Sequence, residues 1–285
     1  MRLIGLYREA EYSPGRHRSN DAILLEQVAD ALRMHAFEVD LMTLTEAAST
    51  RPHAALVFSM CQGPRALDFL MQWEKDGARL INSPRASLNT YRNRLASLMQ
   101  SGGIHFPPTT PIATANGTRT DREVADVNGG VWLKRGDVHA SVSADVQWVD
   151  TVDRLRAGLR EFAARGITHA AIQQHCAGDE IKFYGVAGRR FFHWFYTGEA
   201  RNQLLDPASL QDFAETAAAA AGLDIFGGDI VVAPDGELIL IDLNDWPSFA
   251  PCRDRASEAI AQHLMRRVDA AWNPGLVSSA NESAV

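Results

Sequence analysis

The sequence is poor in features that would each point to a particular class of protein. It has only three cysteines, Cys61, Cys176 and Cys252, and no CxxC pair, which gives no cysteine-based zinc site and favours a reduced intracellular chain in which the cysteines pack. No apolar run is long enough to span a membrane, and the run from Met1 to Leu6 is too short for a signal peptide. We therefore expect a cytoplasmic protein with no membrane partner.

An excess of positive charge and a dinucleotide fingerprint are also missing. The formal net charge of −7 argues against nonspecific nucleic-acid binding. No GxGxxG motif follows the first predicted strand, so a dinucleotide site has no support. A chain of 285 residues with 46% apolar residues can nevertheless bury a substantial core. We expect two or three subdomains and, as the common default, a homodimer.

The stretch from Gly227 to Pro247 predicts a β-hairpin that carries an acidic cluster. Two apolar runs flank a turn with Pro, Asp and Gly. Because residues two apart share one face of a strand, Asp242 and Asn244 project together. An even number of loop residues brings Asp229 to the same face, and a two-residue loop places it directly opposite Asp242.

This cluster predicts a site for a hard cation. Two close carboxylates on a partly buried face push one toward protonation unless a cation neutralises them. Oxygen ligands suit Mg²⁺, with Mn²⁺ as an alternative, and phosphate and water fill its remaining positions. In the competing interpretation Asp229 begins a strand and Asp242 faces solvent, but Asp242 lies inside an apolar run. We therefore predict that Asp229, Asp242 and Asn244 are metal ligands.

Strands and helices alternate in the first third of the chain, which predicts a small, open, mostly parallel α/β sheet. The expected helices begin at Asp21, at about residue 66 and at about residue 86, the last running to residue 100. Pro107, Pro108 and Pro111 then predict a rigid connector. We expect an N-terminal domain over 1–84, a helix, connector and small lobe over 85–176, a C-terminal lobe over 177–273 and a disordered tail over 274–285.

Several residues are candidates for phosphate binding. Lys134 ends an apolar strand and can aim one ammonium at a phosphate, although an edge lysine that reaches solvent fits equally well. Arg94 has the same ambiguity. We favour phosphate binding for His139 because Lys134 and Arg135 are close to it in sequence. Arg201 and Asn202 suit an oxyanion or a transferring phosphoryl group, with a solvated loop as the alternative.

The segment from Gln173 to Glu180 is a candidate linker at a nucleotide base. An apolar strand leads into His175 and Cys176, then a turn, then Glu180 on the next strand. Such a linker can present backbone groups to a purine edge while a carboxylate accepts from ribose hydroxyls. Considered alone, the segment fits an ordinary hairpin better.

Taken in order, these pieces resemble the ATP-grasp superfamily over nearly the whole chain. The most specific match is Asp229 followed by Asp242-Leu243-Asn244, although the family usually has Glu at the second position. Asp242 and the following Asp245-Trp246-Pro247 are similar to the inositol polyphosphate kinases of this fold. The segments 82–95 and 103–107 resemble the ribosomal-protein glutamate ligases and D-alanine–D-alanine ligases.

The resemblance implies an α/β (α+β) chain with the ATP-grasp fold behind an N-terminal open parallel α/β domain, and it implies ATP and Mg²⁺ as cofactors. The residues that it assigns to phosphate are Arg94 and Lys134; to adenine, Gln173, His175 and Cys176; to ribose, Glu180; to metal, Asp229, Asp242 and Asn244; and to the acyl phosphate, Arg201 with Asn202. The glycine-rich loop after Lys134 is short here, so phosphate coverage would rely on His139 or another loop. Gly227 stands where some ligases have an arginine.

Three functions are compatible with this site. The first is a ligase that joins a small-molecule carboxylate to an amine or thiol through an acyl phosphate, with Lys134 and Arg201 stabilising the developing charge. The second is a small-molecule kinase of the inositol polyphosphate kinase type, with His139, Lys182 and Arg201 on substrate phosphates, for which the chain offers few further basic residues. The third is a noncatalytic nucleotide-binding module, which is favoured if the metal ligands cannot meet.

Overall fold

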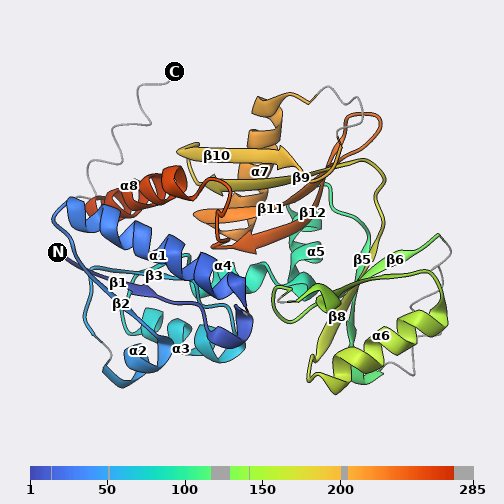
Figure 1. Cartoon of the computed structure of the whole chain (residues 1–285), viewed down its shortest axis with the longest axis horizontal. Helices are drawn as coiled ribbons and strands as arrows, with labels where there is room; N and C mark the ends of the chain where they lie inside the picture. Colours follow the sequence, from blue (N-terminus) through green and yellow to red (C-terminus); the bar gives the residue numbers. More distant parts are fainter. Residues whose placement is uncertain (14, 51, 117–128, 141, 200–204, 273–285) are drawn as a thin grey trace.

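The computed structural model describes residues 1–13, 15–50, 52–116, 129–140, 142–199 and 205–272. Within these ranges the chain forms three four-stranded sheets with helices packed on them (Figure 1). Arg201, Asn202 and the predicted tail over 274–285 lie outside the described residues.

The first sheet is parallel, with strand order β2-β1-β3-β4, which confirms the predicted open α/β unit. Its elements are β1 (Arg2–Leu6), α1 (Arg16–Met34), β2 (Glu38–Met42), α2 (Leu44–Thr50), β3 (Leu56–Ser59), α3 (Pro64–Lys75) and β4 (Leu80–Ile81). The helix predicted to begin at Asp21 begins five residues earlier, at Arg16. Apolar periodicity misses that first turn because it is polar.

The single helix predicted over 86–100 is wrong, because the chain forms α4 (Pro84–Asn89) and α5 (Arg92–Ser101). Between them Tyr91 has an extended backbone, with φ −64° and ψ 130°. Its ring is buried, and its hydroxyl donates a hydrogen bond to the carbonyl oxygen of Gln62 beyond β3. This long-range contact sets where α5 begins, and local sequence does not reveal it.

The second sheet is antiparallel, with order β5-β8-β6-β7, and α6 covers one face. Its elements are β5 (Thr109–Ala113), β6 (Val131–Arg135), β7 (Val146–Val149), α6 (Val152–Ala164) and β8 (His169–Gln174). Short 3-10 turns lie at Ala10–Tyr12, Thr114–Asn116 and Ser143–Asp145. The predicted connector is therefore only partly correct. Residues 109–113 form an edge strand, and Pro111 is tolerated there because an edge strand has backbone positions outside the ladder.

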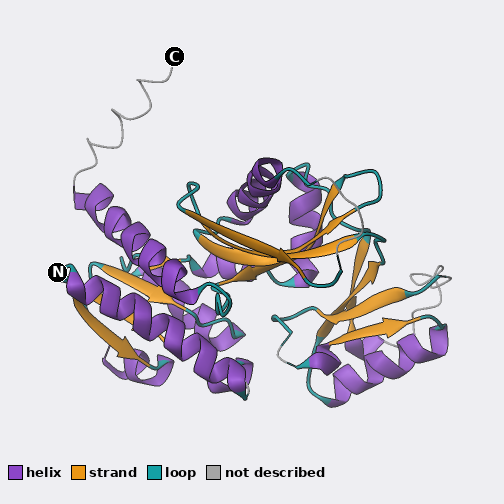
Figure 2. Ribbon diagram, turned by 45° about the horizontal axis from the view of Figure 1, so that its top comes forward, coloured by secondary structure: helices purple, strands orange, loops and turns teal. Residues whose placement is uncertain are grey.

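The third sheet is antiparallel, with order β10-β9-β11-β12. Its elements are β9 (Asp179–Val186), β10 (Phe191–Tyr196), α7 (Pro207–Ala221), β11 (Ile225–Val232), β12 (Leu238–Asp245) and α8 (Arg253–Trp272). α5 and α7 pack on one face through an apolar core. α8 then returns to the N-terminal unit and lies beside α1 (Figure 2).

Each sheet falls within one of the three predicted segments, while the domain division itself stays a prediction. The face of the third sheet that is not covered by α5 and α7 is turned toward α8 at one end and toward the second sheet at the other. Of the predicted site residues, Glu180, Asp229, Asp242 and Asn244 lie on this face. Among the described residues, no helix combines the length and apolar character needed to cross a membrane.

Candidate functional site

β11 and β12 form the predicted hairpin, and Asp229 lies directly opposite Asp242. The even loop on which that prediction rested is wrong. Val232 pairs with Leu238 across an odd connection, and a β-bulge at Ile241 shifts the register between Asp229 and Ile230. The bulge therefore brings the two carboxylates together and places Ile241 beside Asp242 on the same face.

Each carboxylate is held by one cation. Lys182 on β9 is the cross-strand partner of Asp229, and its Nζ lies 2.5 Å from Asp229 Oδ1. The guanidinium of Arg92, in the first turn of α5, pairs with Oδ2 of Asp242. In each carboxylate the second oxygen carries no cation from the described side chains. Each of the two carboxylates on this face is thus already paired with one cationic side chain.

Burial acts differently on the pKa values of the two carboxyl groups. Desolvation raises the pKa of Asp229, and the nearby Asp242 adds to the rise, while Lys182 opposes it. Desolvation would also raise the pKa of Asp242, but Arg92 and Lys134 outweigh it and the pKa lies below its ordinary value. Asp242 is therefore the carboxylate that stays ionised, and a further cation on this face would favour ionisation of Asp229.

Lys134 and Gln173 connect the second sheet to the bulge. Lys134 Nζ lies 3.4 Å from the carbonyl oxygen of Ile241, and Gln173 Nε2 lies 3.3 Å from the same oxygen. Lys134 is buried, and desolvation lowers its pKa to about 8, although Asp242 opposes that shift. Because little opposite charge lies near this ammonium, any anion that reaches it would stabilise the charged form of Lys134.

The two arginines of α5, Arg92 and Arg94, lie in different environments. Arg92 is buried and contacts both Asp242 and the carbonyl oxygen of Arg135, at 3.1 Å. Arg94, the predicted phosphate residue, is exposed. Residues two apart on a helix point about 200° apart, so only one of them can face the site. The position of the break between α4 and α5 determines that Arg92, and not Arg94, faces the site. No local signal in the sequence reveals this break.

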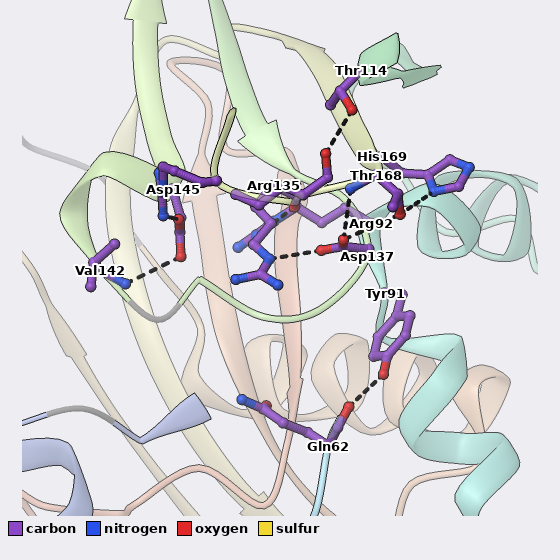
Figure 3. Close-up of polar contacts among 12 residues, drawn as sticks. Gln62, Tyr91, Arg92, Thr114, Arg135, Asp137, Val142, Asp145, Thr168 and His169 are labelled. Carbon is purple, nitrogen blue, oxygen red and sulfur yellow. Dashed lines mark hydrogen bonds and ion pairs between the residues drawn. The ribbon is translucent and has the colours of Figure 1, made fainter. Parts of the chain in front are cut away.

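Hydrogen bonds hold the short loop after Lys134 in place along its length. Arg135 donates to Asp137 at 2.7 Å, and the other oxygen of Asp137 accepts from the backbone of Thr168 at 3.1 Å (Figure 3). The backbone N–H of Gly136 donates to His169, at 2.9 Å. This loop is thus part of the scaffold, and it positions His139.

His139 is buried beside Thr90, and burial lowers its pKa to about 3. Thr90 donates its hydroxyl hydrogen to the carbonyl oxygen of Ser87, at 2.6 Å. The 2.8 Å contact from His139 Nε2 to Thr90 Oγ1 therefore requires Nε2 to be the donor, which leaves Nδ1 as an acceptor. With this tautomer the ring has no N–H to offer a phosphate oxygen, so the geometry does not favour the predicted phosphate role.

The predicted linker lies between β8 and β9. His175 accepts from the indole of Trp132 at 3.3 Å, and Cys176 packs on an apolar patch of the third sheet. Glu180 lies two residues before Lys182 on β9, on the face that carries the carboxylates, and desolvation raises its pKa. The adenine and ribose roles of these residues remain predictions.

Trp132 and Trp148 are part of this region and were not predicted. They are cross-strand partners whose rings make an edge contact, and both rings lie close to that of His175. Trp132 precedes Lys134 by two positions, so the two side chains share a face. That spacing was the signal available in the sequence.

Asn244 lies on the same face as Asp242 and lines a cavity that also reaches His139. Its strand partner is Gly227, where some ligases have an arginine. A Cβ atom at Gly227 would lie 2.8 Å from both Pro247 and the carbonyl oxygen of Phe183. The close packing at this point explains why position 227 is a glycine.

The residues present fit a divalent cation. Two facing carboxylates with one oxygen each uncompensated, and a neighbouring carboxamide, form an oxygen donor set that Mg²⁺ accepts when phosphate and water complete its shell. Across the described ranges no group of three or more His, Cys, Asp or Glu side chains is arranged to hold a metal. The set here has two such residues, so the metal assignment stays a prediction.

Comparison with known proteins identifies the fold. No protein-family model and no curated protein sequence matches the chain. Among solved structures, a RimK domain protein ATP-grasp from Sphaerobacter thermophilus matches with a TM-score of 0.69 at 17% identity, covering 92% of this chain and 98% of that one. D-alanine–D-alanine ligase from Bacillus anthracis complexed with ATP matches with 0.70 at 13% identity, covering 94% and 99%.

A third solved structure is similar over the same length. The ATP-grasp ligase PsnB, complexed with a minimal precursor, Mg and ADP, matches with a TM-score of 0.61 at 18% identity and covers 94% of this chain and 98% of that one. All three carry the arrangement described above along almost their whole length. The chain therefore has the ATP-grasp fold.

Proposed function

We propose that this chain is an ATP-dependent, Mg²⁺-requiring ligase that forms ADP and joins a small-molecule carboxylate to an amine, or to a thiol, through an acyl phosphate. Its structural neighbours include proteins named as D-alanine–D-alanine ligase and ATP-grasp ligase. Reduced cysteines and the need for ATP support a cytoplasmic location.

The observation that carries this proposal is the meeting of two sheets at one point. Asp229 and Asp242 face each other on the third sheet, and Lys134 reaches the adjoining carbonyl oxygen of Ile241 from the second sheet. Carboxylates for a metal and a weakly compensated ammonium for phosphate thus lie close together on two neighbouring sheets. This combination suits a nucleotide polyphosphate with its bound cation.

In this proposal the protein supplies position and charge. Asp229, Asp242 and Asn244 hold the Mg²⁺, which would neutralise phosphate oxygens when bound. Lys134 faces the same phosphates, while Arg92 holds Asp242 in place. A substrate carboxylate oxygen attacks the γ-phosphorus as ADP leaves, and the amine nitrogen then attacks the acyl carbon as inorganic phosphate leaves. No protein nucleophile is needed.

The kinase alternative gains no support from the site. It required Lys182 and His139 to bind substrate phosphates, but Lys182 is paired with Asp229 and His139 presents an acceptor nitrogen. Arg201 lies outside the described residues. A noncatalytic nucleotide-binding module would be favoured if the acidic residues lay apart. Asp229 and Asp242 are instead direct cross-strand partners.

The fate of the γ-phosphate tests the proposal. The full chain is incubated with Mg-ATP and pooled carboxylic acids in the presence of hydroxylamine. A ligase releases ADP and inorganic phosphate in equal amounts and yields a hydroxamate from the trapped acyl phosphate. ADP formation with phosphate retained on an acceptor would instead identify a kinase, and no nucleotide binding at all would reject both.

A further inference from the structure

β10 forms one margin of the third sheet, and among the described residues its outer edge has no partner strand (Figure 1). Its inner edge pairs with β9 from Phe191 to Tyr196 without a bulge. The ladder continues where the N–H of Thr197 donates to the carbonyl oxygen of Glu180 at 2.9 Å. Hydrogen-bonded positions alternate along an antiparallel strand, so the odd-numbered residues of β10 bond to β9. The backbone groups of the even-numbered residues therefore point outward, namely those of Phe192, Trp194 and Tyr196.

These outward backbone groups lie at an open edge. Between described residues, no backbone hydrogen bond from outside the sheet reaches them. α7 packs mainly on β9 and β12, and α8 packs on β9 and α1, so neither helix is centred over β10. The side chains of Phe192, Trp194 and Tyr196 are only partly buried on the α7 face. The edge thus combines free hydrogen-bonding groups with exposed aromatic surface.

The other sheet edges of the described chain are protected against further pairing. Natural proteins protect an edge with charged residues, proline, shortness or a covering segment. β2 carries Glu38 and Asp40, β5 carries Pro111, and β4 and β7 have two and four residues. At β12 the N–H of Leu240 donates to the carbonyl oxygen of His105, at 3.0 Å. β10 has six residues and none of these features, so its edge is suited to pairing.

The sequence of β10 fits an antiparallel copy of itself. Residues that point outward must lie opposite residues that point outward, and side chains directly opposite each other share one face of the sheet. A two-fold axis at Trp194 sets this side chain opposite the partner's Trp194. Phe192 then lies opposite the partner's Tyr196, and on the other face His193 lies opposite the partner's Phe195. Rings meet rings at every one of these positions, and aromatic cross-strand pairs stabilise a sheet.

The charges beside β10 favour the antiparallel orientation. Arg189 and Arg190 precede the strand and Glu199 follows it, and all three are exposed. In the register with its axis at Trp194, Arg189 lies opposite the partner's Glu199, whereas a parallel pair would set like charges side by side. Arg189 is also ion-paired with Asp212 on α7. A second copy therefore matches both ends of the strand, while a uniformly acidic or basic peptide would meet a like charge at one end.

We propose that two copies of this chain associate through β10, so that two four-stranded sheets become one continuous sheet with a two-fold axis at Trp194. Each pair of outward residues exchanges two backbone hydrogen bonds, and the aromatic surface of both edges is buried. β10 and β12, which carries Asp242, are at opposite ends of the strand order. The association is therefore independent of the proposed function.

Sedimentation equilibrium of the full chain over a wide range of concentrations tests the association. We expect a reversible equilibrium between monomer and dimer. A monomer at every concentration would overturn the proposal and would leave the edge to another occupant, such as an extended peptide. A dimer that persists unchanged when β10 is altered would overturn it too, because another surface would then hold the copies together.

A matched pair of variants assigns the surface. Trp194→Lys sets two ammonium groups opposite each other at the axis and should weaken the dimer at least about tenfold. Trp148→Lys is the control, because Trp148 is also a partly exposed tryptophan on an edge strand, β7. It should leave the dissociation constant of the dimer unchanged. Equal dissociation constants in the two variants would refute the assignment.

Cysteine cross-linking tests the register without adding a charge to the edge. In a chain with Cys176→Ser and Cys252→Ser, Trp194→Cys lies about 5.5 Å from its copy between Cα atoms, within reach of a disulfide. Phe192→Cys is the control, since its copy lies four residues along the partner strand, about 14 Å away. Mild oxidation should cross-link the first variant and not the second. Failure of Trp194→Cys to cross-link, or equal cross-linking of both variants, would refute the proposed axis.

Discussion

The guanidinium of Arg92 is ion-paired with the carboxylate of Asp242, although 150 residues separate them in the chain. Both side chains are buried, so each charge depends on the other. The pair fixes α5 against β12 and keeps Asp242 ionised at neutral pH. In the proposed function, this pair would keep the carboxylate ionised and ready to bind a metal ion.

This pair predicts different effects for two substitutions of Asp242. Asp242→Ala leaves Arg92 buried without a counter-charge and should lower the free energy of unfolding by about 3–5 kcal/mol. Asp242→Asn also removes the counter-charge but keeps a hydrogen-bond acceptor for Arg92, so it should lose less stability and remain folded while Mg-ATP turnover falls on the order of a hundredfold or more. Urea unfolding and ADP release measure the two effects.

The control for Asp242→Asn is Asp235→Asn, an exposed position in the turn of the same hairpin. It should retain both stability and turnover. Full turnover in Asp242→Asn would contradict the metal assignment, and an unchanged free energy of unfolding in Asp242→Ala would contradict the dependence of Arg92 on its partner.

The lowered pKa of Lys134 predicts proton uptake when nucleotide binds. At pH 8 about half of the Lys134 side chains are neutral, because burial lowers the pKa to about 8. A bound polyphosphate favours the charged form and raises that pKa, so binding takes up protons near pH 8 and the affinity for ATP falls as the pH rises above it. Calorimetry in buffers of different ionisation enthalpy measures this uptake.

Lys134→Arg is the matched variant for that experiment. Its guanidinium stays charged throughout the range, so ATP should still bind while the proton uptake near pH 8 disappears. Uptake of the same size in the variant would show that another group titrates.

The sequence predicted the hairpin and the parallel N-terminal sheet, because each depends on local alternation and turn chemistry. It did not predict which arginine of α5 reaches the site. That choice depends on the extended backbone at Tyr91, which is held by Gln62 from another part of the chain. Roles that depend on helix rotation therefore required the structure.

The role of His139 could not be predicted from the sequence either, because it depends on the tautomer of the ring. Its neighbours in sequence, Lys134 and Arg135, suggested a phosphate ligand. Its neighbour in space, Thr90, lies on another segment and makes Nδ1 an acceptor. The pairing of Asp229 with Asp242 was predicted correctly for a wrong reason, because a bulge compensates for an odd loop and bulges leave little trace in sequence.

Asp245 predicts a pH dependence of stability. Burial raises its pKa to about 6, although hydrogen bonds from Ser87 and Asn82 oppose the rise. Between about pH 4 and pH 6 the native state holds a proton that the unfolded state has lost, so this group lowers the stability as the pH rises through that window. At pH 7 the cost is about 3 kcal/mol.

Asp245→Asn cannot ionise, so its stability relative to the native chain should rise by about 3 kcal/mol between pH 4 and pH 7. Any effect of the altered hydrogen bonds on Ser87 and Asn82 is independent of pH and drops out of this difference. Urea unfolding of both chains at several pH values measures it. A constant difference between the two chains would show that Asp245 titrates normally.

Trp132 predicts a fluorescence signal for nucleotide binding. Val131 and Leu133 pack on the α6 side of β6, so Trp132 and Lys134 project toward the third sheet, where Val231 and its apolar neighbours lie. A base held between these walls would stack on the indole. Adding ADP should therefore quench the tryptophan emission, and Trp132→Ala should weaken ADP on the order of tenfold, since one stacked base is worth about 1–3 kcal/mol.

Two variants separate stacking from an indirect effect on the fold. Trp132→Phe keeps an aromatic face, so ADP should bind nearly as well by calorimetry while most of the quenching is lost. Trp73→Phe changes a buried indole on α3 in the N-terminal unit, far from this face in the fold, and should keep the quenching. If Trp132→Phe quenches as fully as the native chain, the base does not lie on Trp132, and Trp148 at the same edge becomes the residue to test.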